Sequence, residues 1–295
     1  MKRYDLCLPW YWEYDFDFVR LVEHACYLQG EIFWEVTPDN LLEAITALFQ
    51  EERTFSALLD RSQGDTRFEP LHRWARDHGV RRINPGELSA WSEDKATMHL
   101  ELINGGIYTP YTILLPSFIE QPLLPALDLT PLGEQFVVKP SHGGGGEGVV
   151  LGASSLDHIR RARMEFPEQK YLIQAYVTPR WLNDRPAWFR VFYAGGAVFP
   201  CWWHPSTHVY TELTAQEETD YGLSKLRDVA LHIASICRLD WFSTEIAWTD
   251  REFIVVDYVN DQIDMRLQSK AVDGVPDDLI QKIAERLVLI AREIR

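Results

Sequence analysis

Residues 137–150 read VVKPSHGGGGEGVV, in which four consecutive glycines separate two short apolar runs. Each glycine costs about 0.5–1 kcal/mol of extra chain entropy on folding, so four in a row indicate that the backbone itself has a task here. The apolar runs are strand formers, which predicts a β-hairpin with a glycine-rich tip. Such a tip can fold over a polyphosphate and offer backbone N–H groups to its oxygens. Lys139, just before the tip, supplies a positive charge.

Two other phosphate-binding loops do not fit this stretch. The Walker pattern GxxxxGK[ST] needs a lysine directly after the glycines, and none is there. Gly143, Gly145 and Gly148 match the string GxGxxG, but that fingerprint needs a helix after the loop. Residues 149–151, directly after the loop, are strand formers. We therefore predict strand, loop and strand, with a merely flexible hairpin as the alternative.

The composition is that of a globular protein. The chain has 295 residues, of which 46% are hydrophobic, and a formal net charge of −15. This acidic balance argues against a nucleic-acid or anionic-membrane surface. Four widely separated cysteines without a CxxC pair are typical of free thiols in a reducing compartment. No run of 18 apolar residues and no clean signal sequence is found, so we expect a cytoplasmic protein.

The first 90 residues alternate between strand and helix patterns. The predicted strands are 4–10, 31–36, 54–60 and 80–84, and the predicted helices are 16–29, 38–50 and 68–78. This βαβα order favours a doubly wound parallel sheet.

After residue 90 the strands come in pairs, which favours antiparallel sheets in an α+β arrangement. Hairpins are predicted over 188–203 and 243–259, with turns at Gly195-Gly196 and Asp250-Arg251. The other predicted elements are a Pro-rich connector over 122–133 and helices over 93–106, about 155–165, 223–239 and 277–294. The predicted domains are an N-terminal α/β domain over 1–90, a small lobe with the glycine flap over 91–177, and a C-terminal lobe over 178–295.

The order of motifs after residue 90 resembles that of the ATP-grasp family, and 1–90 is similar to the family's usual N-terminal domain. The helix in EDKATMHLELINGGIYTPYT (93–112) and the lysine before the glycines are similar to the family's two phosphate-binding lysines. HGGGGEG is most similar to the flap of biotin-carboxylase-type members, and LIQAYV (172–177) to the hinge strand beside adenine. WFRVFYAGGAVF (188–199) resembles the RVxxxGG hairpin of RimK-like ligases. DWFSTEIAW and FIVVDYVND, within 240–261, resemble the metal-bearing hairpin.

This resemblance implies ATP and Mg²⁺ (or Mn²⁺) as cofactors. The nucleotide-binding residues that it implies are Lys95, Lys139, His142, Gly143, Gly144, Gly145, Gly146, Gln174, Ala175, Val177 and Asp184. Gln174 stands where many members have Glu, and its amide oxygen can accept the same hydrogen bond from the adenine amine. Asp184 is chosen for the ribose from its position alone, and a solvated loop acid is the alternative.

The predicted metal ligands are Glu245, Asp257 and Asn260. Glu245 and Asp257 lie at similar distances from the turn of one predicted hairpin, so they can face each other. Facing carboxylates repel unless a cation lies between them, and Mg²⁺ prefers oxygen ligands. Family members commonly read E-x-N here, whereas Asp257 and Asn260 are three residues apart. Either a β-bulge restores the geometry or Asp261 takes one of the roles.

The resemblance implies a ligase of the RimK-like or D-alanine–D-alanine-ligase-like kind, which activates a carboxylate as an acylphosphate and joins it to an amine or thiol. The predicted catalytic residues are Arg190, Lys139 and Arg266. Arg266 lies in NDQIDMRLQS (260–269), where a bidentate guanidinium can hold a carboxylate or phosphate. The alternatives are a phosphotransferase on the same fold and a nucleotide-binding protein without turnover. A homodimer is a family-level expectation.

A histidine pair lies just after the second tryptophan-rich strand. His204 and His208 are four residues apart, but Pro205 and the neighbouring strand argue against a zinc-binding helix. We expect both histidines to line an acceptor pocket together with Trp202 and Trp203. The tryptophans and the acidic composition indicate an amphipathic or cationic acceptor.

Overall fold

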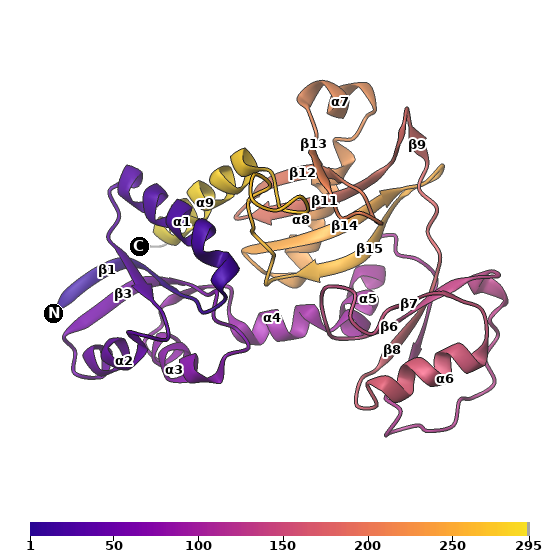
Figure 1. Ribbon diagram of the computed structural model, residues 1–295, viewed down its shortest axis with the longest axis horizontal. Helices are drawn as coiled ribbons and strands as arrows, with labels where there is room; N and C mark the ends of the chain where they lie inside the picture. Colours follow the sequence, from indigo (N-terminus) through magenta and orange to yellow (C-terminus); the bar gives the residue numbers. More distant parts are fainter. Residues whose placement is uncertain (294–295) are drawn as a thin grey trace.

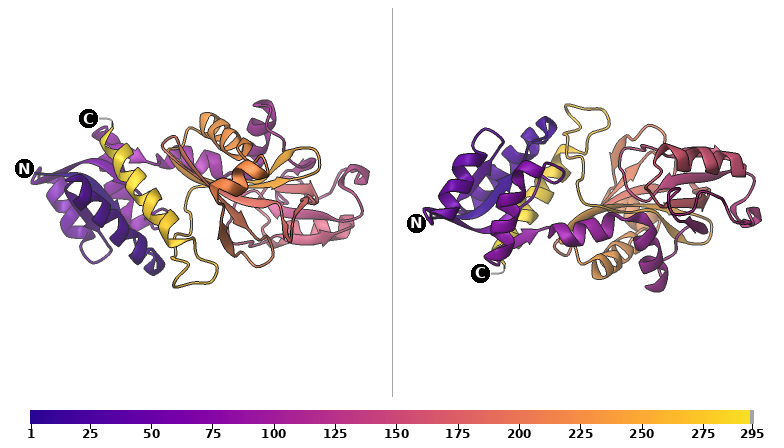
Figure 2. Two further views of the ribbon diagram at one scale, coloured as in Figure 1. Left: turned by 90° about the horizontal axis from the view of Figure 1, so that it is seen from above. Right: turned by 90° about the horizontal axis from the view of Figure 1, so that it is seen from below.

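The computed structural model describes residues 1–293, whose strands form one parallel sheet and three antiparallel sheets (Figure 1). The parallel N-terminal sheet, the five-stranded central sheet and a four-stranded small sheet lie in a row along the longest axis. A two-stranded hairpin projects from the central part. Figure 2 shows the same row from above and below. A mixed α/β and α+β fold was predicted, and it is confirmed.

The N-terminal sheet is doubly wound. Its strands are β1 (Lys2–Pro9), β2 (Phe33–Val36), β3 (Arg53–Leu59) and β4 (Arg81–Ile83), all parallel in the order β2-β1-β3-β4. The helices beside it are α1 (Phe16–Gln29), α2 (Leu41–Phe49) and α3 (Glu69–Asp77), with short 3₁₀ turns at Glu13–Asp15 and Thr66–Phe68. Leu6 and Leu8 pack in one core with α1, whereas Cys7 packs in the other with α2 and α3, because successive strand residues point to opposite faces.

Two helices lead from this sheet to the rest of the chain: α4 (Gly86–Glu93) and α5 (Lys95–Asn104). The sequence predicted one helix over 93–106 and missed α4, so that prediction was wrong at its start. Asp94 separates the two helices with an extended backbone (φ −67°, ψ 97°) and caps α5, since its carboxylate accepts from the N–H groups of Ala96 and Thr97.

The central sheet has the order β13-β12-β11-β14-β15 and is antiparallel. Its strands are β11 (Trp188–Ala194), β12 (Ala197–Trp203), β13 (Tyr210–Glu212), β14 (Trp241–Trp248) and β15 (Phe253–Asn260). Both predicted hairpins are therefore confirmed. Phe189 and Val191 pack against α8 (Lys225–Cys237), while Phe192 and Ala194 pack against the last helix, α9 (Asp277–Arg292). The predicted helix 277–294 is confirmed to Arg292, and Ile294 lies outside the described residues.

The small sheet carries the glycine hairpin. Its strands are β5 (Thr112–Leu115), β6 (Phe136–Pro140), β7 (Val150–Ala153) and β8 (Tyr171–Ala175), in the order β5-β8-β6-β7. The predicted pairing of the strands around the glycines is confirmed, and α6 (Leu156–Glu165) covers one face of the sheet. The Pro-rich connector is irregular except for a 3₁₀ turn at Thr130–Leu132. Four further short elements were not predicted: β9 (Trp181–Leu182), β10 (Arg185–Pro186), α7 (Ala215–Asp220) and β13 of the central sheet.

The last helix packs against the first elements of the chain. Helix α9 comes after the central sheet in sequence but shares a core with α1 and β1 of the N-terminal sheet (Figures 1 and 2). The predicted domain boundaries at residues 90 and 177 remain a proposal.

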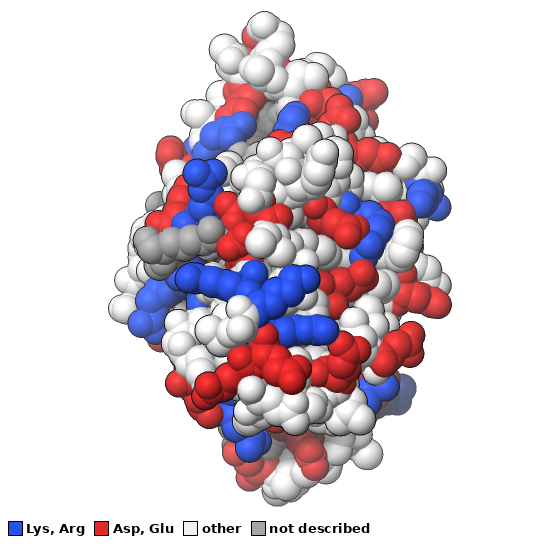
Figure 3. All heavy atoms as spheres, turned by 90° about the vertical axis from the view of Figure 1, so that its left-hand side faces the viewer, with Lys and Arg blue, Asp and Glu red and all other residues white. Residues whose placement is uncertain are grey.

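None of the helices within residues 1–293 has the length and the apolar sequence that a membrane span requires. Figure 3 shows acidic and basic side chains interspersed on the face at the N-terminal end of the molecule.

Candidate functional site

Three charged side chains meet on one face of the central sheet. Glu245 of β14 lies directly opposite Asp257 of β15 and, on its other side, directly opposite Arg190 of β11. A guanidinium N–H of Arg190 donates to Glu245, and another donates to the hydroxyl of Ser243 at 3.1 Å. The side chains of Arg190 and Glu245 are only 14% and 12% exposed. The facing carboxylates predicted from the hairpin are therefore present, with an arginine beside them.

Bulges in β15 set the position of the third predicted metal ligand. Ser243 pairs with Asn260 and Glu245 pairs with Asp257, so three residues of β15 oppose two of β14 at this point. The amide of Asn260 then donates to the carboxylate of Asp257 at 3.0 Å. The bulge expected from the three-residue spacing is present.

Asp261, the alternative metal ligand, is engaged elsewhere. Its side chain is buried and accepts hydrogen bonds from the amides of Asn84 and Gln63, both from the N-terminal part of the chain. Burial raises the pKa of Asp261, while these amides and Ser89 lower it. Asp261 thus belongs to the junction between the N-terminal and central sheets.

Two lysines approach the carboxylates from the side of the small sheet. Lys139 at the end of β6 is 7% exposed, and its ammonium donates to the carbonyl of Val256 on β15 at 3.0 Å. Lys95 at the start of α5 donates from its side chain to the carbonyl of Gly143 at 2.7 Å. Its backbone N–H donates to the carbonyl of Ser141. The first turn of α5 is thus joined to the glycine loop.

These cations control the protonation of the two carboxylates. Burial alone would raise the pKa of Asp257, but Lys95, Lys139 and Arg190 together lower it to about 2. Burial raises the pKa of Glu245, Arg190 opposes that rise, and the charge of Asp257 adds to it. Burial also lowers the pKa of Lys139, which Asp257 and Glu245 counteract. The two carboxylates therefore differ in basicity although they face each other.

The glycine loop between β6 and β7 forms tight turns with little side-chain cover. Gly143, Gly145, Gly146 and Gly148 all have positive φ, a conformation that favours glycine. Residues 142–147 are exposed, and the ring of His142 bonds to the side chain of Gln169 at 3.0 Å. The backbone amides of this loop are thus covered by few side chains.

The predicted hinge strand is joined to the central sheet by a buried tyrosine. Gln174 donates from its amide to the hydroxyl of Tyr258 at 2.7 Å and to that of Thr112 at 3.0 Å. The same tyrosine hydroxyl is hydrogen bonded to His99 of α5 at 2.6 Å, and Lys139 lies 5.1 Å from the centre of its ring. Sequence reasoning missed Tyr258. Its only signal was its place between Asp257 and Asn260.

The environment of His99 results from this packing. Burial and the charge of Lys139 lower the pKa of His99 to about 4, so the ring is neutral near pH 7. Past Gln174, the N–H of Ala175 donates to the carbonyl of Tyr111, and Val177 lies two residues beyond the end of β8.

Two predicted residues do not join the charged cluster. Asp184 lies at the turn between β9 and β10, 90% exposed, and its nearest cation is Arg185 at 3.9 Å. Arg266 forms ion pairs with Asp264 at 2.6 Å and Asp273 at 3.0 Å. No pattern in the sequence indicated this pairing of Arg266, because Asp273 reaches it only through the folding of the loop before α9.

The tryptophans and histidines after Arg190 divide between the two faces of the central sheet. Trp202 is buried beside Phe189, on the face covered by α8. Trp203 lies on the face of Arg190, at 6.0 Å from its guanidinium, and stacks on His208 with ring centres 5.1 Å apart. Only part of the predicted acceptor group thus faces the charged cluster. The ring of His204 instead accepts hydrogen bonds from the backbone of its own loop.

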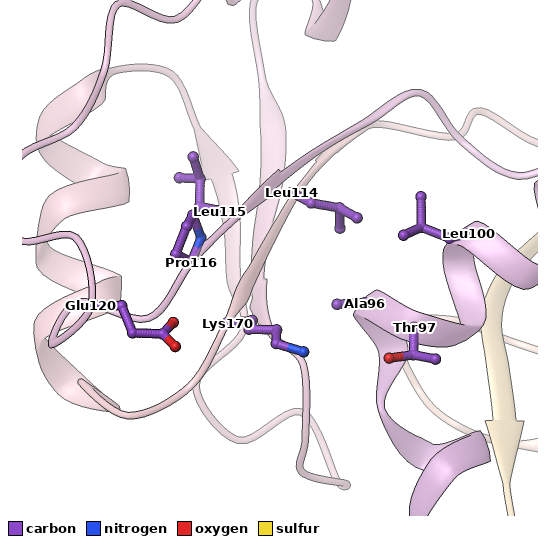
Figure 4. A pocket seen from close by; sticks show the side chains of 8 residues that line it. All are labelled: Ala96, Thr97, Leu100, Leu114, Leu115, Pro116, Glu120 and Lys170. Carbon is purple, nitrogen blue, oxygen red and sulfur yellow. The ribbon is translucent and has the colours of Figure 1, made fainter.

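Two cavities lie outside this cluster. One, of about 370 Å³, is lined by Leu114 and Leu115 of β5, by Thr97 and Leu100 of α5, and by the charged side chains of Glu120 and Lys170 (Figure 4). The other, of about 710 Å³, lies between β12 and the start of α9, and Cys201 and Lys282 contribute to its wall. Neither is lined by the predicted nucleotide-binding or metal-binding residues.

The described residues contain no group of three or more His, Cys, Asp or Glu side chains that could hold a metal by themselves. A magnesium ion in a nucleotide site usually needs only one or two carboxylates, because phosphates and water complete its shell. Glu245 and Asp257 provide two carboxylates, and the low pKa of Asp257 keeps it ionised. The residues present fit an ion that binds together with a polyphosphate.

No known family model and no curated protein matches the chain by sequence. Solved structures match it over nearly its whole length. A RimK-domain ATP-grasp protein from Sphaerobacter thermophilus is 20% identical with a TM-score of 0.63, covering 96% of this chain and 99% of that chain. The D-alanine–D-alanine ligase of Bacillus anthracis, solved with ATP, is 15% identical with a TM-score of 0.67, covering 99% of both chains.

A third match is the ATP-grasp ligase PsnB, solved with a minimal precursor, Mg and ADP. It is 13% identical with a TM-score of 0.61, covering 98% of this chain and 99% of that chain. At these identities the likeness is one of fold. The sheet orders and the full-length matches together show that the chain has the ATP-grasp fold.

Proposed function

We propose that the protein is an ATP- and Mg²⁺-dependent ligase that joins a carboxylate to an amine. The observation that carries the proposal is the convergence of Lys95, Lys139, Arg190, Glu245 and Asp257 on one face of the central sheet. ATP carries about four negative charges, so its site needs several cations. ATP-grasp ligases with this fold that were solved with ATP, or with ADP and Mg, support the choice of nucleotide and metal.

The proposed role of each residue follows from its position. Lys95 and Lys139 hold the phosphates from the side of the small sheet, and the glycine loop covers them with backbone N–H groups. Glu245, Asp257 and Asn260 hold Mg²⁺, which neutralises phosphate charge when bound. His142, at the glycine loop, is a proposed phosphate contact. The proposed adenine contacts are Gln174, Ala175 and Val177, and the proposed ribose contact is Asp184.

The proposed reaction has two steps. An oxygen of the substrate carboxylate attacks the γ-phosphorus, and the bond to ADP breaks with its electron pair leaving on ADP. The amine nitrogen then attacks the acyl carbon, the bond from this carbon to the phosphate oxygen breaks with its electron pair leaving on phosphate, and the amine proton passes to solvent. Arg190, held by Glu245 and Ser243, is oriented to stabilise the acylphosphate oxygens. Arg266 is already paired with Asp264 and Asp273, which together carry two negative charges. We therefore propose that it orients a substrate and does not bind the phosphates of ATP.

The first test is ATP binding by calorimetry with and without Mg²⁺. The wild type is compared with the double variant Glu245→Ala/Asp257→Ala. The control is Asp250→Ala, in the exposed turn of the same hairpin. We expect Mg²⁺-dependent binding in the wild type and the control, and its loss in the double variant. Absence of ATP binding in the wild type would exclude the ligase and the phosphotransferase alike.

Product analysis then separates the possible reactions. Hydroxylamine converts an acylphosphate to a hydroxamate, so a ligase given ATP and its carboxylate substrate forms ADP and a hydroxamate. A phosphotransferase forms ADP and a phosphoester without hydroxamate. A nucleotide-binding protein without turnover forms neither product. The Lys139→Met variant should lose ADP formation in the first two cases.

A further inference from the structure

The strand order of the central sheet separates the nucleotide side from the acceptor side. Asp257, Glu245 and Arg190 lie on β15, β14 and β11 in turn, and the next strand is β12. Lys139 reaches the sheet at β15. The lysines thus lie at the β15 side of the charged cluster, and β12 lies at its opposite side. A substrate that approaches from that opposite side passes over β12.

Strand β12 ends in an aromatic stack on the same face as Arg190. Cys201 is the cross-strand partner of Arg190, and Trp203, two residues on, shares its face. The ring of Trp203 is half-buried and lies 10° from parallel with that of His208. His208 has φ +60°, so the left-handed backbone turns this ring back over the strand end. The stack thus borders the charged cluster beside Arg190, whose guanidinium lies 6.0 Å from the ring centre of Trp203.

The loop before α9 adds charge beside this stack. Arg266 is paired with both Asp264 and Asp273, so this group carries two negative charges and one positive charge. Burial raises the pKa of Asp273, the hydrogen bond from Arg266 lowers it, and the nearby His208 lowers it further. The loop lies beside the central sheet, because the side-chain amide of Gln268 donates to the carbonyl of Tyr210 on β13, the neighbour of β12, at 2.9 Å.

The segment after β1 brings further aromatic rings. Residues 10–16 read WYWEYDF, and Tyr11, Trp12, Tyr14 and Phe16 are 42%, 38%, 52% and 53% exposed. The guanidinium of Arg266 lies 6.0 Å from the ring centre of Tyr14. This segment lies at the carboxyl end of a parallel strand, the edge where open α/β sheets bind ligands. Four exposed aromatic side chains in one such segment indicate an apolar partner.

We propose that Tyr14, Trp203, His208, Asp264 and Asp273 form an acceptor surface for an amine that is protonated in solution and carries an aromatic ring. The rings bind the aromatic group by stacking, and the two carboxylates favour the ammonium. The inference rests on the proposed function, since it identifies the class of the amine that attacks the activated carboxylate. In this proposal, Trp203 and His208 determine which amine binds.

The experiment titrates amines by calorimetry in the presence of Mg²⁺ and a non-hydrolysable ATP analogue. The probes are phenethylamine, propylamine, which lacks the ring, and 3-phenylpropionate, which has the ring but the opposite charge. Phenethylamine should bind about tenfold more tightly than either of the others, as expected for one well-placed aromatic and cation contact. Equal binding of phenethylamine and propylamine would overturn the proposal.

Variants locate the site. Trp203→Ala and His208→Asn should each weaken phenethylamine about fivefold and leave propylamine unchanged, because asparagine tolerates the positive φ of position 208. The matched control is Trp181→Ala, which removes a 64% exposed tryptophan on β9. Wild-type affinity in both test variants, or the same loss in the control, would overturn the proposal.

Nucleotide binding distinguishes this failure from that of the proposed function. The same samples are titrated with the ATP analogue before the amine. If the analogue binds and the ring confers no advantage, only the acceptor surface is wrong. If the analogue does not bind, the ligase proposal fails, and the amine titration without nucleotide still decides whether the surface prefers aromatic amines.

Discussion

Asp257 is the residue whose ionisation most directly supports the charged cluster. Its pKa is lowered from the usual 3.8 to about 2, so its carboxylate stabilises the fold at any pH above 3.8 and loses this effect as the pH falls toward 2. We expect Asp257→Asn to lower the free energy of unfolding by on the order of 1–2 kcal/mol at pH 7. Relief of Glu245, whose pKa Asp257 raises, offsets part of the loss.

Urea unfolding at pH 7, 5 and 3 checks this expectation. The difference between wild type and Asp257→Asn should be equal at pH 7 and pH 5 and smaller at pH 3. Asp250→Asn, in the exposed turn of the same hairpin, should match the wild type at every pH. A difference that grows at pH 3 would mean that Asp257 is not the ionised partner of the lysines.

At the residue scale, the sequence could predict those contacts that depend only on counting along one hairpin. Glu245 and Asp257 were predicted to face each other from their similar distances to a turn, and the bulge beside them from the spacing to Asn260. The bond from Gln174 to Tyr258 could not be found in this way, because it joins strands of two different sheets. Counting residues from a turn predicts which residues pair within a hairpin. Contacts between two sheets depend on how the sheets pack, which the sequence pattern does not show.

Among the elements, the glycine loop makes a sharp prediction because its glycines differ. At Gly148 φ is +70°, and a Cβ would lie 2.6 Å from the ring of Phe166. At Gly144 a Cβ would meet nothing within 4 Å. Gly148→Ala should therefore lower the free energy of unfolding by about 1–3 kcal/mol through strain and overpacking, and Gly144→Ala by less than about 0.5 kcal/mol.

Calorimetric melting of the two variants measures the difference in their stability. ATP titration shows whether the glycine loop of each variant still binds phosphate. Gly148→Ala should melt lower than Gly144→Ala by several degrees, since about 1 kcal/mol corresponds to a few degrees at this chain length. Equal melting temperatures would show that Phe166 moves aside and that the loop is not held by this contact.

The elements that the sequence predicted are those with a strong local pattern. Helices α1 and α8 and both hairpins of the central sheet show apolar periodicity and turn residues. Helix α4 was missed because it begins at Gly86, directly after Pro85, and a Pro-Gly pair usually marks a turn. The pairing of β5 with β8 was out of reach, since about 55 residues separate them and local periodicity carries no such information.

On the scale of the whole molecule, a buried ion pair in the N-terminal part holds an arginine that contacts the segment after β15. Asp15 and Arg61 are both 2% exposed and lie 2.5 Å apart, and Arg61 also donates to the carbonyl of Ile263 at 2.8 Å. The rings of Phe18 and Trp241, from α1 and β14, lie within 5.7 Å of the same guanidinium. These contacts join the N-terminal sheet and α1 to the central sheet and to the segment after β15.

A double-mutant cycle on this pair tests how strongly the ion pair that holds Arg61 at the junction stabilises the fold. Asp15→Ala leaves a buried guanidinium without its carboxylate and should cost about 3–5 kcal/mol of unfolding free energy. Asp15→Ala/Arg61→Met should cost less than the sum of the single changes, because the apolar pair removes both charges. The control is the exposed pair Asp157–Arg161, 57% and 77% exposed, whose loss should cost less than about 0.5 kcal/mol. Additive losses at Asp15 and Arg61 would mean that the two residues act independently and that the ion pair does not stabilise the fold as a unit.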